Sequence, residues 1–178
     1  FGKIHDHRKA TDMVLRKPGS AILLVGARKD ELGGGLFYRT CLKHRGGTVP
    51  RFRGAHEKKM AEWVLDAVRD GKALSVHDIS TGGLAIAAAE MCLASGRLGI
   101  ELNLDSNPVN LYSETPGYLV EVSEDFAESA TLPEFVSRVG TVCPGSFLSG
   151  VGWSLDLGSV RQRWENRLHR VIWREEEI

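Results

Sequence analysis

The sequence predicts a layered α/β domain, with helices and strands intermixed along the chain. Three observations support this fold class. Residues 20–27 (SAILLVGA) are apolar on both faces, as in a strand that is covered by helices on both sides. Residues 57–70 place their apolar side chains on one helical stripe. Residues 84–94 (LAIAAAEMCLA) are alanine-rich and apolar nearly all round, which predicts a buried helix.

The elements of the first half follow from turn and helix signals. Pro18-Gly19 predicts a turn before the strand at 20–27, and Gly33-Gly34-Gly35 predicts a second turn, followed by a short helix at 36–43. The helix at 57–70 stops at Gly71. Its apolar stripe consists of Met60, Trp63, Val64, Ala67 and Val68. A strand is predicted at 73–79.

The second half is predicted in the same way. Ser80 or Thr81 is expected to cap a helix that ends near Ala94. Residues 99–104 alternate between apolar and polar, which predicts a half-buried strand, and 118–122 forms another. Weaker strand patterns lie at 140–143 and 151–155. Residues 124–139 are expected to be partly helical, with Pro133 breaking or restarting the helix, and a closing helix is expected at 160–173.

Composition excludes several classes of protein. The 178 residues suit one domain with its own core, and Lys+Arg and Asp+Glu both number 23, which gives no electrostatic signature for nucleic acid or an anionic membrane. Cys41, Cys92 and Cys143 are odd in number and far apart, so we expect reduced thiols in a cytoplasmic protein rather than disulfides or a zinc site. No apolar run is long enough to span a bilayer, and no signal peptide is visible.

The most informative segment is residues 77–84 (HDISTGGL), where a strand meets a helix. The helix N-terminus could bind phosphate, with Ser80, Gly82 and Gly83 at the ligand, and Asp78 could hold Mg²⁺. The alternative is a tight structural junction in which Asp78 and Ser80 cap and the glycines relieve crowding. Physical reasoning alone favours this second interpretation.

The other polar clusters give weaker signals. Residues 31–35 (ELGGG) form neither a Walker loop nor a dinucleotide fingerprint. Residues 113–117 (SETPG) place the Glu114 carboxylate in a turn, where it could contact a ligand or serve as a cap. Glu90 lies within the apolar helix, so we expect it to have a structural partner. His5 and His7 share a face if that stretch is a strand, but no third metal ligand is apparent.

The order of these motifs resembles the C-terminal domain of phosphoribosylformylglycinamidine synthases, specifically the second such domain of the long catalytic subunit. The matching stretches are 18–26, 31–35, 77–91 and 111–122. The resemblance implies a three-layer α/β/α domain of the aminoimidazole ribonucleotide synthase-like superfamily, with a mixed, partly ferredoxin-like sheet. It also implies a reaction in which ATP and Mg²⁺ activate the amide oxygen of formylglycinamide ribonucleotide so that ammonia displaces it.

The resemblance further implies partners and a limited role. The partners would be the N-terminal domains of the same chain and a glutaminase that supplies ammonia, while a homodimer is left open. The second half of such synthases is generally the non-catalytic copy, so no catalytic residue is expected. Asp78 matches a Mg²⁺-binding position of the first half, and Ser113, Glu114 and Thr115 match its substrate-contacting loop.

Three departures from the family pattern affect this cleft. Thr81 stands where the family has Asp, Gly35 where it has Ser, and Tyr118 where it often has Arg. One acid and one cation are therefore missing. Because the chain opens with Phe1, we expect residues 1–178 to be a single C-terminal domain cut from a longer ligase. The alternatives are another ATP-using member of the superfamily (a HypE-like maturation factor or a selenophosphate synthetase-like protein) or a stand-alone binding module.

Overall fold

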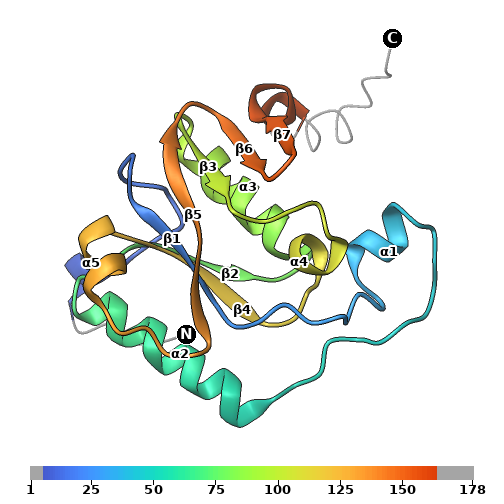
Figure 1. The fold of residues 1–178 in the computed structure, drawn as a ribbon, viewed down its shortest axis with the longest axis horizontal. Helices are drawn as coiled ribbons and strands as arrows, with labels where there is room; N and C mark the ends of the chain where they lie inside the picture. The colour runs from blue at the N-terminus through green and yellow to red at the C-terminus, as the bar shows by residue number, and fades with distance from the viewer. Residues whose placement is uncertain (1–5, 164–178) are drawn as a thin grey trace.

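The computed structural model describes residues 6–163. Seven strands form one mixed sheet in the order β2-β4-β1-β5-β3-β6-β7 (Figure 1). Neighbouring strands are antiparallel, except that β3 and β6 run parallel. The strands are β1 (Ala21–Val25), β2 (Ala73–Ile79), β3 (Leu98–Leu102), β4 (Gly117–Val122), β5 (Val136–Pro144), β6 (Phe147–Gly150) and β7 (Trp153–Asp156).

Helices cover both faces of the sheet. The helices are α1 (Leu36–Thr40), α2 (Gly54–Arg69), α3 (Gly83–Ser95), α4 (Pro108–Tyr112) and α5 (Glu124–Ser129). The side chains of Ile22 and Leu24 in β1 pack into the core under α3, whereas Ala21, Leu23 and Val25 pack into the core under α2 and α5. Two cores therefore lie on opposite faces of one sheet, which confirms the predicted layered α/β class with a mixed sheet.

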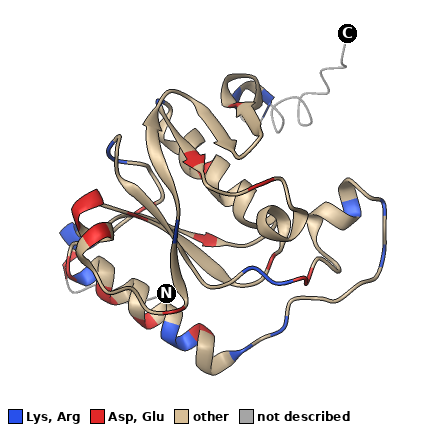
Figure 2. Cartoon of the chain, in the orientation of Figure 1, with Lys and Arg blue, Asp and Glu red and all other residues tan. Residues whose placement is uncertain are grey.

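Charged residues are concentrated on the exposed helix α2 and on the loop before it. Figure 2 shows basic and acidic residues along α2, whose outer face is exposed, while α3 carries little charge. Residues 41–53 link α1 to α2 and contain Lys43, Arg45, Arg51 and Arg53 but no acid. None of the described helices is long and apolar enough to cross a membrane.

Several predicted elements are shifted. α2 begins at Gly54, before the predicted start at 57, and β5 is much longer than the predicted strand at 140–143. β6 was not predicted. α5 ends at Ser129 and no helix restarts after Pro133, because β5 begins at Val136. The backbone is helical at 157–163, and the remainder of the predicted closing helix lies outside the described residues.

The three thiols are free, as predicted. Cys41 is exposed, Cys143 is half-buried and Cys92 is buried within α3. Burial raises the pKa of the Cys92 thiol to about 12. Cys92 is therefore a protonated core side chain at neutral pH.

Ala88→Arg is expected to abolish cooperative folding. Ala88 is 0% exposed in the middle of α3, so an arginine there would be both overpacked and unpaired in an apolar core. We expect a loss of more than about 4 kcal/mol. Ile86→Arg is the matched control, because Ile86 is exposed on the same helix. Thermal melts by circular dichroism compare the two, and equal melting temperatures would contradict the buried position of Ala88.

Candidate functional site

The Glu114 carboxylate organises the junction between β2 and α3. Its Oε1 accepts hydrogen bonds from the backbone N–H groups of Gly82 and Leu36, both at 2.8 Å. Gly82 immediately precedes α3, and Leu36 is the first residue of α1. One carboxylate from a distant turn thus satisfies N–H groups at the starts of two helices, where such groups lack intrahelical partners.

The prediction that Ser80 or Thr81 caps this helix is wrong. The N-cap position is Gly82, no side chain makes the usual capping bond, and both Ser80 and Thr81 are exposed. The local sequence offered hydroxyl groups at the right place, but the backbone turns at Gly82 with φ of 87° and presents its N–H to Glu114 instead.

Both glycines of the junction have a positive φ, and Gly83 is also required by packing. Gly83 has a φ of 76°, and a Cβ on it would lie 2.6 Å from the backbone carbon of Tyr112. The end of α4 therefore lies directly on the start of α3. The Gly83 N–H donates to Ser80 O at 3.1 Å. Gly83 therefore permits backbone contact with α4, which agrees with the interpretation that the glycines relieve crowding.

A half-buried cation holds the turn at 113–117. The Arg28 guanidinium donates to the backbone oxygens of Ser113 (3.3 Å), Thr115 (2.6 Å) and Pro116 (3.2 Å). The Ser113 hydroxyl donates to Lys29 O at 2.7 Å and lies 2.8 Å from Thr115 Oγ1. Burial lowers the pKa of Arg28 to about 10, which leaves it charged near neutral pH. These polar atoms of the turn thus form hydrogen bonds within the protein.

Glu31 of the ELGGG motif is buried and ion-paired. Its carboxylate accepts hydrogen bonds from the Arg53 guanidinium and from Arg51 N (3.3 Å), and Thr115 Oγ1 lies 3.4 Å away. The hydrogen bond from Arg53 is the main reason that the pKa of Glu31 is lowered. Arg53 precedes α2, so this pair fixes the end of the long loop against the ELGGG turn.

The glycines of the same motif fix the middle of that loop. Gly33 N donates to Thr48 O at 2.8 Å, and a Cβ on Gly33 would lie 2.5 Å from the backbone of Gly47. In this structure the ELGGG motif therefore anchors residues 41–53. Sequence reasoning missed Arg28 and Arg53, although a Glu in a glycine-rich turn a few residues after a buried strand was a signal that a cation was needed.

Asp78 and Ser80 lie beside this network but outside it. The Asp78 side chain is 64% exposed on the edge strand β2, with Oδ1 3.3 Å from His77 Nδ1. With Tyr118 and Glu57 they border a cavity of about 200 Å³. His77 Nε2 lies 2.9 Å from Glu90 Oε2, which is the structural partner that Glu90 was expected to have.

The described residues offer no cluster of metal ligands. Among residues 6–163, no group of three or more His, Cys, Asp or Glu side chains could hold a metal ion. His7 lies in a short 3-10 helix (His7–Lys9) rather than a strand, and His5 lies outside the described residues. Of the predicted site residues, the structure therefore brings together Gly82, Gly83 and the turn at 113–115. Asp78 lies apart from them, and its carboxylate is close to the His77 ring.

Residues 17–151 match the family model for the AIR synthase related protein, C-terminal domain. The chain belongs to this family. A curated relative, the phosphoribosylformylglycinamidine synthase subunit PurL of Methanothrix thermoacetophila, is 34% identical over 190 residues, which cover 96% of this chain. The corresponding subunit of Nocardia farcinica is 35% identical over 186 residues and 97% of this chain. The chain spans only 24% of the length of each relative.

Solved structures show the same fold. T. maritima PurL complexed with FGAR superposes with a TM-score of 0.70 at 18% identity, over 86% of this chain and 30% of that chain. E. coli HypE, a hydrogenase maturation protein, gives a TM-score of 0.54 at 19% identity, over 83% of this chain and 52% of that chain. The predicted family resemblance is confirmed, and these likenesses support the fold alone.

Proposed function

We propose that residues 1–178 form the C-terminal domain of a longer ATP-dependent carbon–nitrogen ligase of the phosphoribosylformylglycinamidine synthase type, and that this domain is a non-catalytic scaffold. The names of the curated relatives support the ligase class. One observation supports the scaffold role. The N–H groups of Gly82 and Leu36, which would face a phosphate at this junction, already bind the Glu114 carboxylate.

ATP and Mg²⁺ belong to the proposed full-length enzyme, but the described residues do not fit either group. A phosphate at Gly82 would compete with the negative charge of Glu114 for the same N–H groups. Mg²⁺ needs several oxygen ligands in octahedral geometry, whereas Asp78 is a single exposed carboxylate beside a histidine. We therefore assign nucleotide and Mg²⁺ to other parts of the longer polypeptide.

The proposed partners follow from this role. They are the N-terminal domains of the same polypeptide and a glutaminase that supplies ammonia, in the cytoplasm. The 24% share of the PurL relatives and the match to a structure of PurLQS from Thermotoga maritima support this proposal. The fold of HypE favours a second candidate, a maturation factor of the same superfamily. The length of the coding region upstream of Phe1 separates the two, since the chain spans 24% of the PurL relatives but 52% of the HypE chain.

The isolated chain is expected to make no formylglycinamidine ribonucleotide. Supplied with formylglycinamide ribonucleotide, Mg-ATP and ammonia, it should release no substrate-dependent ADP, because the phosphate-facing N–H groups are occupied and no metal cluster is present among residues 6–163. A coupled ADP assay measures this. Steady ADP release that requires the ribonucleotide and disappears in Asp78→Asn would contradict the scaffold role.

Asp78→Asn is expected to change little. Nucleotide affinity should stay within about twofold, and stability within about 0.5 kcal/mol, because the Asp78 carboxylate is exposed and its one ion pair among the described residues is with His77. Calorimetric titration with Mg-ATP and Mg-ADP measures the first, and a thermal melt measures the second. Glu114→Gln is the matched comparison and should cost about 1 kcal/mol or more, since the charge at two helix starts is lost. Tight nucleotide binding that vanishes in Asp78→Asn, with an unaltered melt, would overturn our interpretation.

A further inference from the structure

The loop between α1 and α2, residues 41–53, combines unpaired positive charge with exposed apolar side chains. The cations are Lys43, Arg45 and Arg51, and the apolar residues are Leu42 (55% exposed), Val49 (57%) and Phe52 (84%). Among the described residues, these three cations form no ion pair and no side-chain hydrogen bond. The loop contains no acid, although the whole chain has equal numbers of acidic and basic residues, and its cations appear in blue in Figure 2. Large apolar side chains that are exposed among cations are typical of a surface that binds another molecule.

Contacts with the ELGGG motif and with α1 hold this loop in shape. Gly33 N donates to Thr48 O at 2.8 Å, and His44 N donates to Tyr38 O at 2.9 Å. The His44 ring also meets the Tyr38 ring edge-on, with centroids 5.3 Å apart. In Figure 1 the loop runs along the outside of the molecule between α1 and α2. A surface that is already ordered loses less conformational entropy when a partner binds.

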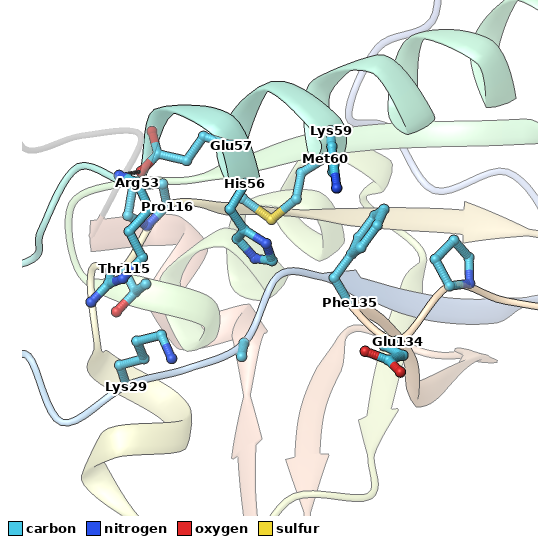
Figure 3. A pocket seen from close by; sticks show the side chains of 12 residues that line it. Lys29, Arg53, His56, Glu57, Lys59, Met60, Thr115, Pro116, Glu134 and Phe135 are labelled. Atoms are coloured by element: carbon cyan, nitrogen blue, oxygen red, sulfur yellow. Dashed lines mark hydrogen bonds between the residues drawn. The ribbon is translucent and has the colours of Figure 1, made fainter.

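Arg53, the last residue of the loop, belongs to a different part of the molecule. It is ion-paired, and in Figure 3 it borders a cavity of about 490 Å³ together with Thr115 and Pro116 of the turn described above. No residue of 42–52 lines that cavity or the cavity of about 200 Å³ at the β2–α3 junction. The exposed surface at 42–52 is therefore separate from the candidate site.

We propose that residues 42–52 bind an extended acidic peptide segment of a separate protein. Carboxylates of the peptide pair with the three free cations, and a large apolar side chain of the peptide packs on Phe52. The backbone of the loop also suits an extended partner, because the N–H groups of Lys43, Arg45 and Val49 donate to no acceptor among the described residues. These groups can bind the carbonyl oxygens of a peptide that lies along the loop.

Two other anionic partners fit this surface less well. Nucleic acid is bound by a larger excess of Lys and Arg than three side chains in a chain of zero net charge. An anionic membrane would bury Val49 and Phe52, but it would leave the unpaired N–H groups of the loop in hydrocarbon without acceptors, which is costly. A peptide supplies carboxylates, an apolar side chain and carbonyl groups together.

A fluorescein-labelled, glutamate-rich peptide with leucine and phenylalanine at its centre is the probe. By fluorescence anisotropy at low ionic strength, it should bind the chain saturably and about fivefold or more tighter than each of two matched peptides. One matched peptide has serine in place of the apolar pair, and the other has glutamine in place of glutamate, so each carries only half of the recognised chemistry. Binding of the probe should weaken as salt is raised, because exposed charges are screened.

Phe52→Ser should weaken binding of the probe about fivefold or more, and Arg45→Gln about threefold. Leu65→Ser and Arg97→Gln are the matched controls. Leu65 is 45% exposed on α2, and Arg97 is an exposed cation after α3, so each control removes the same kind of group from outside the loop. Both controls should leave binding unchanged.

The proposal is overturned if the probe shows no saturable binding, if the serine peptide binds as tightly, or if Arg97→Gln weakens binding as much as Arg45→Gln. It is also overturned if vesicles of anionic phospholipid or a single-stranded oligonucleotide bind this surface more tightly than the probe does. Sedimentation of the chain alone tests a second copy as the occupant, and self-association that Phe52→Ser abolishes would contradict a peptide partner. Thermal melts of all variants confirm that each is folded.

Discussion

Gly83→Ala is expected to lower the free energy of unfolding by about 3 kcal/mol or more. Gly83 has a φ of 76°, a conformation that costs a residue with a Cβ about 1–3 kcal/mol. The new Cβ would also lie 2.6 Å from the Tyr112 carbonyl carbon and 2.8 Å from Leu111 O. Because both neighbours are backbone atoms, they cannot rotate away, and overpacking of this kind costs about 1–3 kcal/mol more. Gly83→Val should be worse still.

Gly71→Ala separates the two contributions. Gly71 follows α2 with a φ of 70°, but a Cβ there would meet nothing within 4 Å. This variant should therefore lose only the conformational cost, about 1 kcal/mol. Urea unfolding of both variants provides the comparison. If Gly71→Ala and Gly83→Ala lose the same free energy, then contact between α4 and the start of α3 does not explain the second glycine of the junction.

Elements with a strong local pattern could be predicted from the sequence. β2 has the predicted bounds, and α2 buries the predicted side chains Met60, Val64 and Ala67. β5 was underestimated because its pattern is mixed. Ser137 and Arg138 are exposed, and the register with β1 shifts between Ile22 and Leu23, so no clean alternation runs along the strand. Its length is set by pairing with β1 and β3 on either side, which is non-local information.

The candidate site shows the same limit. The place of the junction followed from its glycines, because positive φ is a local property of the backbone. That Glu114 could serve as a cap was one of the predicted alternatives, but the helices it caps did not follow, since it lies 32 residues from Gly82 and the contact exists only once the sheet has assembled. The sequence predicted which groups were polar, but not which partners would satisfy them.

Glu121 shows how much such a distant network can contribute. It lies in β4 among apolar neighbours and is fully buried. Its carboxylate accepts hydrogen bonds from the backbone N–H groups of Arg16 (2.9 Å) and Lys17 (3.0 Å), and from the hydroxyls of Ser20 (2.6 Å) and Ser75 (2.8 Å). No cation pairs with it among the described residues. Hydrogen bonds to the charged form alone stabilise this buried anion, and they tie the segment before β1 to the sheet.

Glu121→Gln is therefore expected to lower the free energy of unfolding by about 3–4 kcal/mol. The amide has nearly the same shape, but it loses the charge that strengthens each hydrogen bond, and its NH₂ group would face donors that it cannot accept from. Glu128→Gln is the control, since Glu128 is exposed on α5, and it should change stability by less than about 0.5 kcal/mol. Urea unfolding measures both. Amide hydrogen exchange should further show faster exchange at Arg16 and Lys17 in Glu121→Gln, because their N–H groups lose their acceptor. Equal stability of the two variants would mean that the hydrogen bonds to Glu121 are not what holds this segment on the sheet.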